Sequence, residues 1–122
     1  MQLFISPGAC SLAPHIALLE AGADFESVKV DLATRKTEAG DDFLAVNPSG
    51  KVPALTLDNG QSLTENPAIL LYIADQNPGV GLAPAEGSIE RYQLLSRLSF
   101  LGSELHKAFV PLFTPGTTDD AK

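Results

Sequence analysis

The sequence is poor in several residue types, and each shortage excludes a class of protein. A single cysteine among 122 residues excludes an internal disulfide and favours a reducing cytoplasm. Only 8 lysines and arginines stand against 15 aspartates and glutamates, and the net charge of -7 argues against a nucleic-acid surface. The longest apolar run, Ala68–Ala74, is too short to cross a membrane, and residues 1–4 lack the cationic start of a secretory signal. We therefore expect a cytoplasmic protein with neither nucleic acid nor membrane as partner.

The apolar content of 44% is enough for a packed core, and its pattern predicts an α/β domain over residues 1–78. Short apolar stretches predict four strands: Gln2–Ser6, Val28–Leu32, Ala54–Leu57 and Gln61–Leu63. Further stretches predict three helices: Ser11–Ala21, Glu38–Val46 and Ala68–Gln76. In this βαβαββα order, the first two strands are expected to pair in parallel, and the Asn59-Gly60 turn predicts an antiparallel hairpin. The prediction is a mixed sheet covered by helices.

Local signals define the ends of two of these helices. Ser11 is expected to cap the first helix, and Gly22 to end it in a left-handed conformation. Three apolar residues of that helix share a face: Leu12, Ile16 and Leu19. Asn66 is expected to cap the third helix, because Pro67 suits the first helical position.

The second part of the chain has a different composition. Residues 79–87 are rich in glycine and proline and are expected to form a linker. From Ser88, apolar residues recur at steps of three and four, which predicts one long helix ending near Pro111. A lone amphipathic helix cannot bury its apolar stripe by itself. We therefore expect residues 88–122 to be the start of an all-α domain, and the chain to be truncated.

Cys10 lies between the first strand and the first helix. The amides at the start of a helix favour a thiolate, so this position is typical of a reactive cysteine. The alternative is a small buried residue without chemistry. No second cysteine follows it, so any redox chemistry must use one thiol.

Two further positions suit an amino-acid or peptide ligand. Val52 precedes Pro53 at the start of a predicted strand, where a cis bond would leave the Val52 main chain free to pair with an extended peptide. Glu65 and Asn66 begin a helix, so a carboxylate and free amides lie side by side there. Together they suit the ammonium and carboxylate of an α-amino acid, although an ordinary capped helix is the alternative.

The remaining polar residues carry weaker signals. His106 shares a helix face with Ser99 and Ser103, a polar strip that either faces a cleft or is solvated surface. Arg35 can hold a carboxylate or belong to a solvated loop. His15 lies among apolar residues and is expected to be packed in the core. No metal-ligand spacing and no phosphate-binding glycine motif is present in the sequence.

Four segments of the sequence resemble those of a known protein family. Residues 6–15 (SPGACSLAPH), 47–55 (NPSGKVPAL) and 63–69 (LTENPAI) resemble the bacterial beta-class glutathione transferases, as does Glu104–Lys107. The resemblance covers the chain from Met1 to about Phe113. It implies a thioredoxin-like glutathione-binding domain, followed by the first helix of an all-α C-terminal domain.

The resemblance also implies roles for particular residues. Cys10 meets the glutathione sulfur, Val52 pairs with the cysteinyl unit, Glu65 and Asn66 take the γ-glutamyl head, and Arg35 reaches the glycyl end. A segment of the late helix closes the site, with His106 nearest the sulfur and catalytic together with Cys10. That segment comprises Ser99, Ser103, Glu104, Leu105 and His106. Ser99, Arg35 and Asn66 depart from the asparagine, lysine and serine or glycine that are usual in the family.

Three functions follow from the resemblance. The first is a detoxifying transferase that joins the glutathione thiolate to a hydrophobic electrophile, with glutathione as co-substrate and no metal. The second is a monothiol disulfide oxidoreductase that acts through Cys10. The third is a non-catalytic module that binds glutathione or a hydrophobic compound. A homodimer is expected for the full-length protein.

Overall fold

A computed structural model describes residues 1–121 of the chain. These residues form two compact units, Met1–Ala83 and Pro84–Lys122, referred to below as unit 1 and unit 2. The division falls within residues 79–87, the segment in which the sequence predicts a linker.

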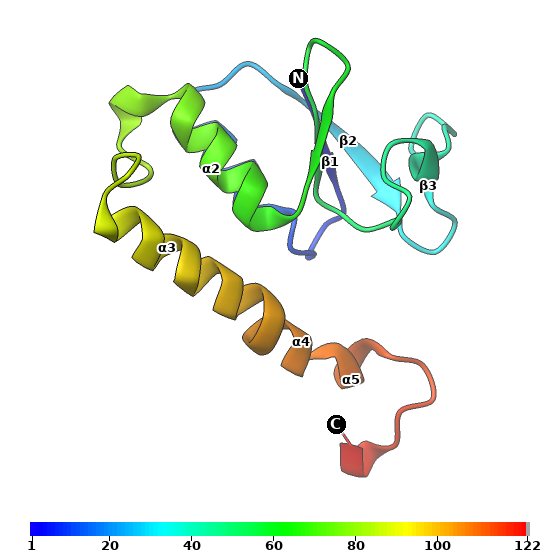
Figure 1. The fold of residues 1–122 in the computed structure, drawn as a ribbon. Helices are drawn as coiled ribbons and strands as arrows, with labels where there is room; N and C mark the ends of the chain where they lie inside the picture. Colours follow the sequence, from blue (N-terminus) through cyan, green and yellow to red (C-terminus); the bar gives the residue numbers. More distant parts are fainter. Residues whose placement is uncertain (122) are drawn as a thin grey trace. The chain divides into compact units, whose positions relative to one another are not determined.

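Unit 1 is built on a mixed sheet of five strands (Figure 1). The strands are β1 (Gln2–Ile5), β2 (Glu26–Asp31), β3 (Lys36–Thr37), β4 (Ala54–Thr56) and β5 (Ser62–Thr64). Their order is β3-β2-β1-β4-β5, in which β1 and β2 are parallel and the other neighbours antiparallel. Two helices follow β1 and β5, namely α1 (Leu12–Glu20) and α2 (Asn66–Gln76). The predicted thioredoxin-like α/β fold is confirmed.

The alternation of side chains along the strands divides the core of unit 1 between the two faces of the sheet. One cluster joins β1 and β4 to both helices and consists of Leu3, Ile5, Leu18, Leu55, Ile69 and Ile73. The other cluster lies on the opposite face and consists of Phe4, Val30, Phe43, Val52 and Ala54. β1 contributes to both clusters, so it is the centre of the fold. Its carboxyl end leads directly into the turn that carries Cys10.

The helix predicted over Glu38–Val46 is wrong. β3 ends at Thr37, just before this stretch, and the stretch itself holds only a single 3₁₀ turn, η1 (Phe43–Ala45). Turn chemistry outcompetes the weak helical pattern, because Gly40 adopts a positive φ of 90° and the Asp42 side chain accepts a hydrogen bond from the Leu44 amide at 3.0 Å. Phe43 still reaches the core, so one turn covers a sheet face for which a helix was predicted.

The start of α1 also differs from the expectation. Ser11 makes no capping hydrogen bond. Its buried hydroxyl instead accepts from the Ser6 amide at 3.1 Å and donates to the Ser6 carbonyl at 3.2 Å, which closes the Cys10 turn. The helix ends as predicted at Gly22, with a φ of 64°. Its apolar face of Leu12, Ile16 and Leu19 is exposed, because Pro14 and Leu18 are the residues that α1 buries.

Unit 2 is a run of helical segments. These are α3 (Ile89–Phe100), the π-helical η3 (Leu101–Leu105), α4 (His106–Ala108) and α5 (Val110–Phe113). Ser88 caps α3 by accepting a hydrogen bond from the Arg91 amide at 3.3 Å. The helix predicted to end near Pro111 is thus interrupted at η3 and continues to Phe113. Within residues 1–121, no helix is long and apolar enough to span a membrane.

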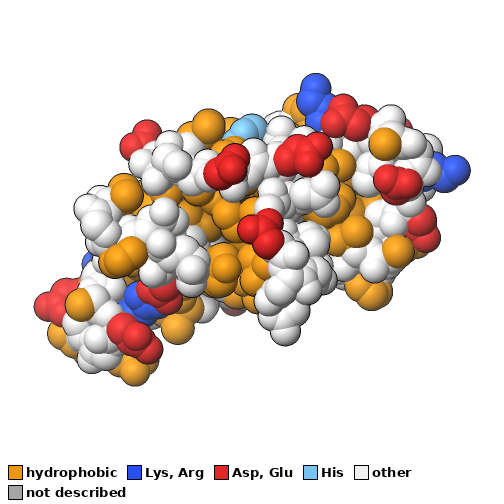
Figure 2. Space-filling view, turned by 90° about the horizontal axis from the view of Figure 1, so that it is seen from above, with side chains coloured by type: hydrophobic (Ala, Val, Ile, Leu, Met, Phe, Trp, Pro, Cys, Tyr) orange, Lys and Arg blue, Asp and Glu red, His pale blue; other side chains and the backbone are white. Residues whose placement is uncertain are grey.

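Unit 2 buries none of its described side chains. Several large apolar residues are exposed, among them Tyr92, Phe100, Leu101, Leu105 and Phe109. Figure 2 shows one face of the molecule, on which hydrophobic side chains lie at the surface between acidic ones.

Candidate functional site

The candidate site in unit 1 is built around Cys10. The turn from Ser6 to Cys10 leaves β1 and enters α1, and a hydrogen bond of 3.1 Å from the Ala9 amide to the Ser6 carbonyl closes it. The Cys10 side chain is half-buried, and its Sγ donates to the main-chain carbonyl of Val52 at 3.1 Å. This contact joins two residues 42 positions apart in the sequence.

The state of the Cys10 thiol corrects the prediction from its helix-start position. Burial raises the pKa of Cys10 above its ordinary value, the negative charge of Glu65 raises it further, and a main-chain hydrogen bond and Lys51 oppose the rise. Desolvation outweighs the helix-start effect, so at neutral pH Cys10 is a thiol that donates a hydrogen bond and not a thiolate.

Val52 presents its main chain at the edge of the same site. The Val52–Pro53 bond, for which the sequence offered a cis form as a candidate, is cis, and the Val52 side chain is buried. The loop before it is shaped by Asn47, whose buried side chain donates to the Lys51 carbonyl at 2.8 Å and accepts from the Ser49 amide at 3.1 Å. The loop is therefore held by its own side chain-to-backbone hydrogen bonds.

Arg35, in the turn between β2 and β3, contacts this loop. Its Nη1 donates to the Gly50 carbonyl at 2.6 Å, and its Nε and Cδ lie 3.0 and 3.1 Å from the position that a Cβ on Gly50 would take. Gly50 has a φ of 67°, and Arg35 itself has a φ of 58°. A guanidinium has five N–H donors, so Arg35 keeps others for a ligand.

The N-terminus of α2 differs in detail from the prediction. Glu65, and not Asn66, is the capping residue, and it has a φ of 73° that is rare outside glycine. Asn66 is the first helical residue, and its Nδ2 donates to the Cys10 carbonyl at 3.0 Å. Its Oδ1 is buried and has no hydrogen-bond partner among the described residues. Pro67 lies in the first turn, as predicted.

Four of the predicted site residues therefore converge in unit 1. Val52 and Asn66 bond to Cys10, and the charge of Glu65 acts on its pKa. Arg35 does not contact Cys10, but it donates to the carbonyl of Gly50, two residues before Val52. Sequence reasoning missed Lys51 and Asn47 as contributors, although both lie in the stretch 47–55 that carries the family resemblance.

The other predicted site residues lie in unit 2 and are exposed. The Ser103 hydroxyl donates back to the Ser99 carbonyl at 2.9 Å. Glu104 and Leu105 lie in the π-helical segment η3, which adds a residue to the turn. The common face predicted for Ser99, Ser103 and His106 assumed regular α spacing, and η3 shifts the side chains that follow it.

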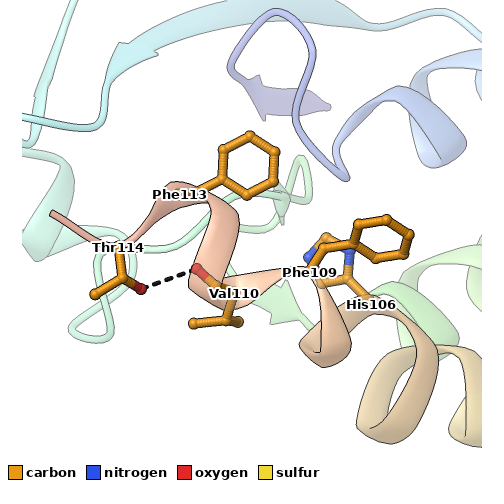
Figure 3. A pocket seen from close by; sticks show the side chains of 5 residues that line it. All are labelled: His106, Phe109, Val110, Phe113 and Thr114. Carbon is orange, nitrogen blue, oxygen red and sulfur yellow. Dashed lines mark hydrogen bonds between the residues drawn. The ribbon is translucent and has the colours of Figure 1, made fainter. Parts of the chain in front are cut away.

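His106 lines a pocket of about 250 Å³ within unit 2. The other lining residues are Phe109, Val110, Phe113 and Thr114 (Figure 3). The Thr114 hydroxyl donates to the Val110 carbonyl at 2.9 Å, so its polar group is already satisfied. Two aromatic rings and a valine offer an apolar surface with the imidazole at its border. No group of histidine, cysteine or carboxylate side chains that could hold a metal occurs within residues 1–121.

Comparison with known proteins gives a consistent result. Residues 1–75 match the family model described as glutathione S-transferase, N-terminal domain. The chain is 52% identical over its whole length to glutathione S-transferase GstA of Escherichia coli O157:H7, of which it covers 61%.

Two solved structures are similar to this chain over 99% of its length, each with a TM-score of 0.96. One is a sphingomonad glutathione S-transferase complexed with glutathione, at 83% identity, and the other a bacterial beta-class glutathione S-transferase of Sphingomonas chungbukensis, at 78%. The chain spans about 60% of the length of these relatives. It belongs to the glutathione S-transferase family, and the resemblance to the bacterial beta class is confirmed.

Proposed function

We propose that this chain carries the glutathione site of a glutathione transferase that joins the glutathione thiolate to hydrophobic electrophiles. The observation that supports this most strongly is the convergence of Cys10, the Val52 main chain and the N-terminus of α2 in unit 1. A sphingomonad relative with 83% identity has been solved with glutathione bound, which supports the same assignment.

Each part of glutathione has a chemical counterpart in this cluster. The Val52 main chain pairs with the cysteinyl unit, as an added strand pairs with a sheet edge. The carboxylate of Glu65 takes the γ-glutamyl ammonium, and the amide of Asn66 at the start of α2 takes the adjacent carboxylate. Arg35 takes the glycyl carboxylate with the donors that it does not use on Gly50.

The protonation state of Cys10 favours conjugation over thiol exchange. The S–H of Cys10 can rotate about the Cβ–Sγ bond from the Val52 carbonyl to the glutathione thiolate, and a hydrogen bond donated there lowers the free energy of the thiolate. A Cys10 thiolate would repel the glutathione thiolate. The thiolate then attacks the electrophile, a carbon–sulfur bond forms, and the leaving group departs with its electron pair. The raised pKa of Cys10 supports this donor role.

From the family resemblance we also propose that five residues of unit 2 act on glutathione, namely Ser99, Ser103, Glu104, Leu105 and His106. The electrophile occupies the apolar pocket of His106, Phe109, Val110 and Phe113, whose volume of about 250 Å³ lies just below the range usual for small-molecule sites. The exposed apolar side chains of unit 2 support a homodimer, because such surfaces mark interfaces. A working Cys10 thiol needs reducing conditions, so we place the protein in the cytoplasm.

A monothiol oxidoreductase is the second candidate, and the position of the lone cysteine beside Val52 supports it. In that reaction the Cys10 thiolate attacks one sulfur of oxidised glutathione, a mixed disulfide forms, and a glutathione thiolate leaves. A module that binds without turnover is the third candidate.

Three measurements on the purified chain separate the candidates. The transferase predicts saturable binding of glutathione by calorimetry and release of chloride from an activated aromatic chloride. It also predicts that Cys10→Ser, which keeps a donor, retains more conjugation than Cys10→Ala. If the protein is an oxidoreductase, both variants should lose disulfide exchange entirely, and neither should specifically change the release of chloride from the aromatic substrate. Saturable binding without either product would support the binding module, and no binding would contradict all three.

A further inference from the structure

Asn66 uses its side chain for an unusual purpose at the start of a helix. Asn66 is the first residue of α2, one position after the N-cap residue Glu65, and no side-chain capping bond exists at this helix. The Asn66 amide instead crosses to the β1–α1 turn, where its Nδ2 donates to the main-chain carbonyl of Cys10 at 3.0 Å. The two residues are 56 positions apart, so this bond fixes the turn to α2.

Cys10 is consequently held at two points. Asn66 holds its main-chain carbonyl, and the Val52 carbonyl accepts from its Sγ at 3.1 Å. With the backbone and the sulfur both fixed, the side chain has little freedom to turn away from the Val52 edge. The thiol therefore faces the main chain with which the cysteinyl unit of glutathione is proposed to pair.

The oxygen of this amide shows that stability alone does not explain the residue. Asn66 Oδ1 is buried without a partner among the described residues, and leaving a buried acceptor unpaired costs free energy. A smaller side chain would avoid this cost. The amide orientation is nevertheless set, because only its Nδ2 can donate to the Cys10 carbonyl.

We propose that Asn66 is a positioning residue that acts through Cys10, holding the thiol where it meets the sulfur of bound glutathione. The proposal rests on the glutathione site described above. It assigns the Asn66 side chain a task distinct from that of its main-chain amide, which is proposed to contact the γ-glutamyl head.

The test compares Asn66→Ala with Asn77→Ala. Asn77 is a matched control, because its Nδ2 also donates to a main-chain carbonyl, that of Ile73 at 2.9 Å, at the other end of α2. Intact mass spectrometry follows the formation of the Cys10 adduct with oxidised glutathione and, separately, with 2-hydroxyethyl disulfide. The ratio of the two rate constants measures how well a bound tripeptide is presented to the thiol. Calorimetry with S-methylglutathione measures binding without reaction.

For Asn66→Ala we expect the rate ratio to fall about tenfold, the effect of losing one hydrogen bond in the reacting complex. The dissociation constant for S-methylglutathione should stay within about threefold, because the main-chain amide remains. Asn77→Ala should leave both quantities unchanged. Asn66→Ser, whose shorter side chain cannot span to Cys10, should repeat the result and provides a second folded variant.

Two outcomes overturn the proposal and are distinguishable from failure of the site itself. An unchanged rate ratio in Asn66→Ala would show that the bond to Cys10 links two parts of the fold but does not position the thiol. A loss of S-methylglutathione binding as large as the fall in rate would show that Asn66 acts on the ligand and not through Cys10. If the unsubstituted chain reacts equally fast with both disulfides, the glutathione site is wrong and this inference fails with it.

Discussion

The two units of this chain differ in how far they bury their apolar residues. Unit 1 buries two clusters, one on each face of its sheet, and its described strands and helices all contribute to or flank these clusters. Unit 2 has an apolar stripe at helical spacing but buries none of its described side chains. Unit 1 therefore has a core that can stabilise it, whereas the helices of unit 2 depend on packing that these residues do not provide among themselves.

The same difference applies to the proposed site. In unit 1, Cys10 is fixed by contacts to residues 42 and 56 positions away. In unit 2, the polar groups of Ser103 and Thr114 bond to carbonyls four residues back in their own helices. Long-range contacts hold a geometry that local ones cannot, so we expect the specificity for glutathione to reside in unit 1.

The largest predicted difference concerns core leucines. Leu55→Ala removes a side chain with 0% exposure in the first cluster and should lower the free energy of unfolding by about 2 to 5 kcal/mol. Leu105→Ala in unit 2 removes a side chain that is 48% exposed and should change it by less than about 1 kcal/mol. Urea unfolding measures both, and equal losses would contradict the contrast between the units.

The next effect concerns ligand binding. Glu65→Gln removes the charge proposed to hold the γ-glutamyl ammonium, and glutathione should bind roughly 10- to 100-fold more weakly by calorimetry. Glu20→Gln, at the exposed end of α1, serves as the control and should leave the affinity unchanged. If Glu65→Gln binds glutathione as tightly as the unsubstituted chain, Glu65 does not hold the γ-glutamyl ammonium.

A smaller effect is predicted for two glycines with similar backbone angles. Gly50 and Gly116 have φ values of 67° and 79°, so alanine is unfavourable at both. A Cβ at Gly50 would lie 3.0 Å from Arg35 Nε and 3.2 Å from Leu44 Cδ2, whereas nothing lies within 4 Å at Gly116. Gly50→Ala should lower the free energy of unfolding by about 2 kcal/mol, and Gly116→Ala should leave the unit 1 transition unchanged. Equal effects would show that the Arg35 contact is loose.

The smallest effects concern the reactivity of Cys10. Its raised pKa leaves little thiolate at pH 7, so iodoacetamide should alkylate the folded chain more slowly than the chain in urea. Glu65→Gln removes a charge that raises the pKa and should speed the reaction a few-fold, while Lys51→Gln should slow it. The alkylation rate should be measured against pH. A midpoint for the folded chain below that of the urea-unfolded chain would mean that folding lowers the pKa of Cys10, contrary to this prediction.

The sequence predicted those features of the fold that depend on nearby residues. The hairpin at Gly60 and the stop at Gly22 follow from residues whose conformational preferences are strong. The cis bond before Pro53 was a candidate only, because trans is the usual form of an X-Pro bond. The helix over Glu38–Val46 failed because its periodicity was weak and the turn residues Gly40 and Asp42 prevailed.

The sequence motifs pointed to Cys10, Val52, Glu65 and Asn66 as members of one site, but not to its chemistry. In unit 1 the structure brings Val52 and Asn66 into hydrogen-bond contact with Cys10, and the charge of Glu65 acts on the pKa of Cys10. The thiol state of Cys10 depends on burial and on a carbonyl 42 residues away, which no local pattern records. The bond from the Asn66 side chain to Cys10 was missed for the same reason.

The most direct test of the central claim is a titration of the ¹⁵N-labelled chain with S-methylglutathione, followed by amide chemical shifts. If unit 1 holds the glutathione site, the largest shifts will occur at Cys10, Val52 and Asn66, and they will saturate together. Shifts at these amides no larger than at Glu38, which directly follows the edge strand β3, would contradict the claim.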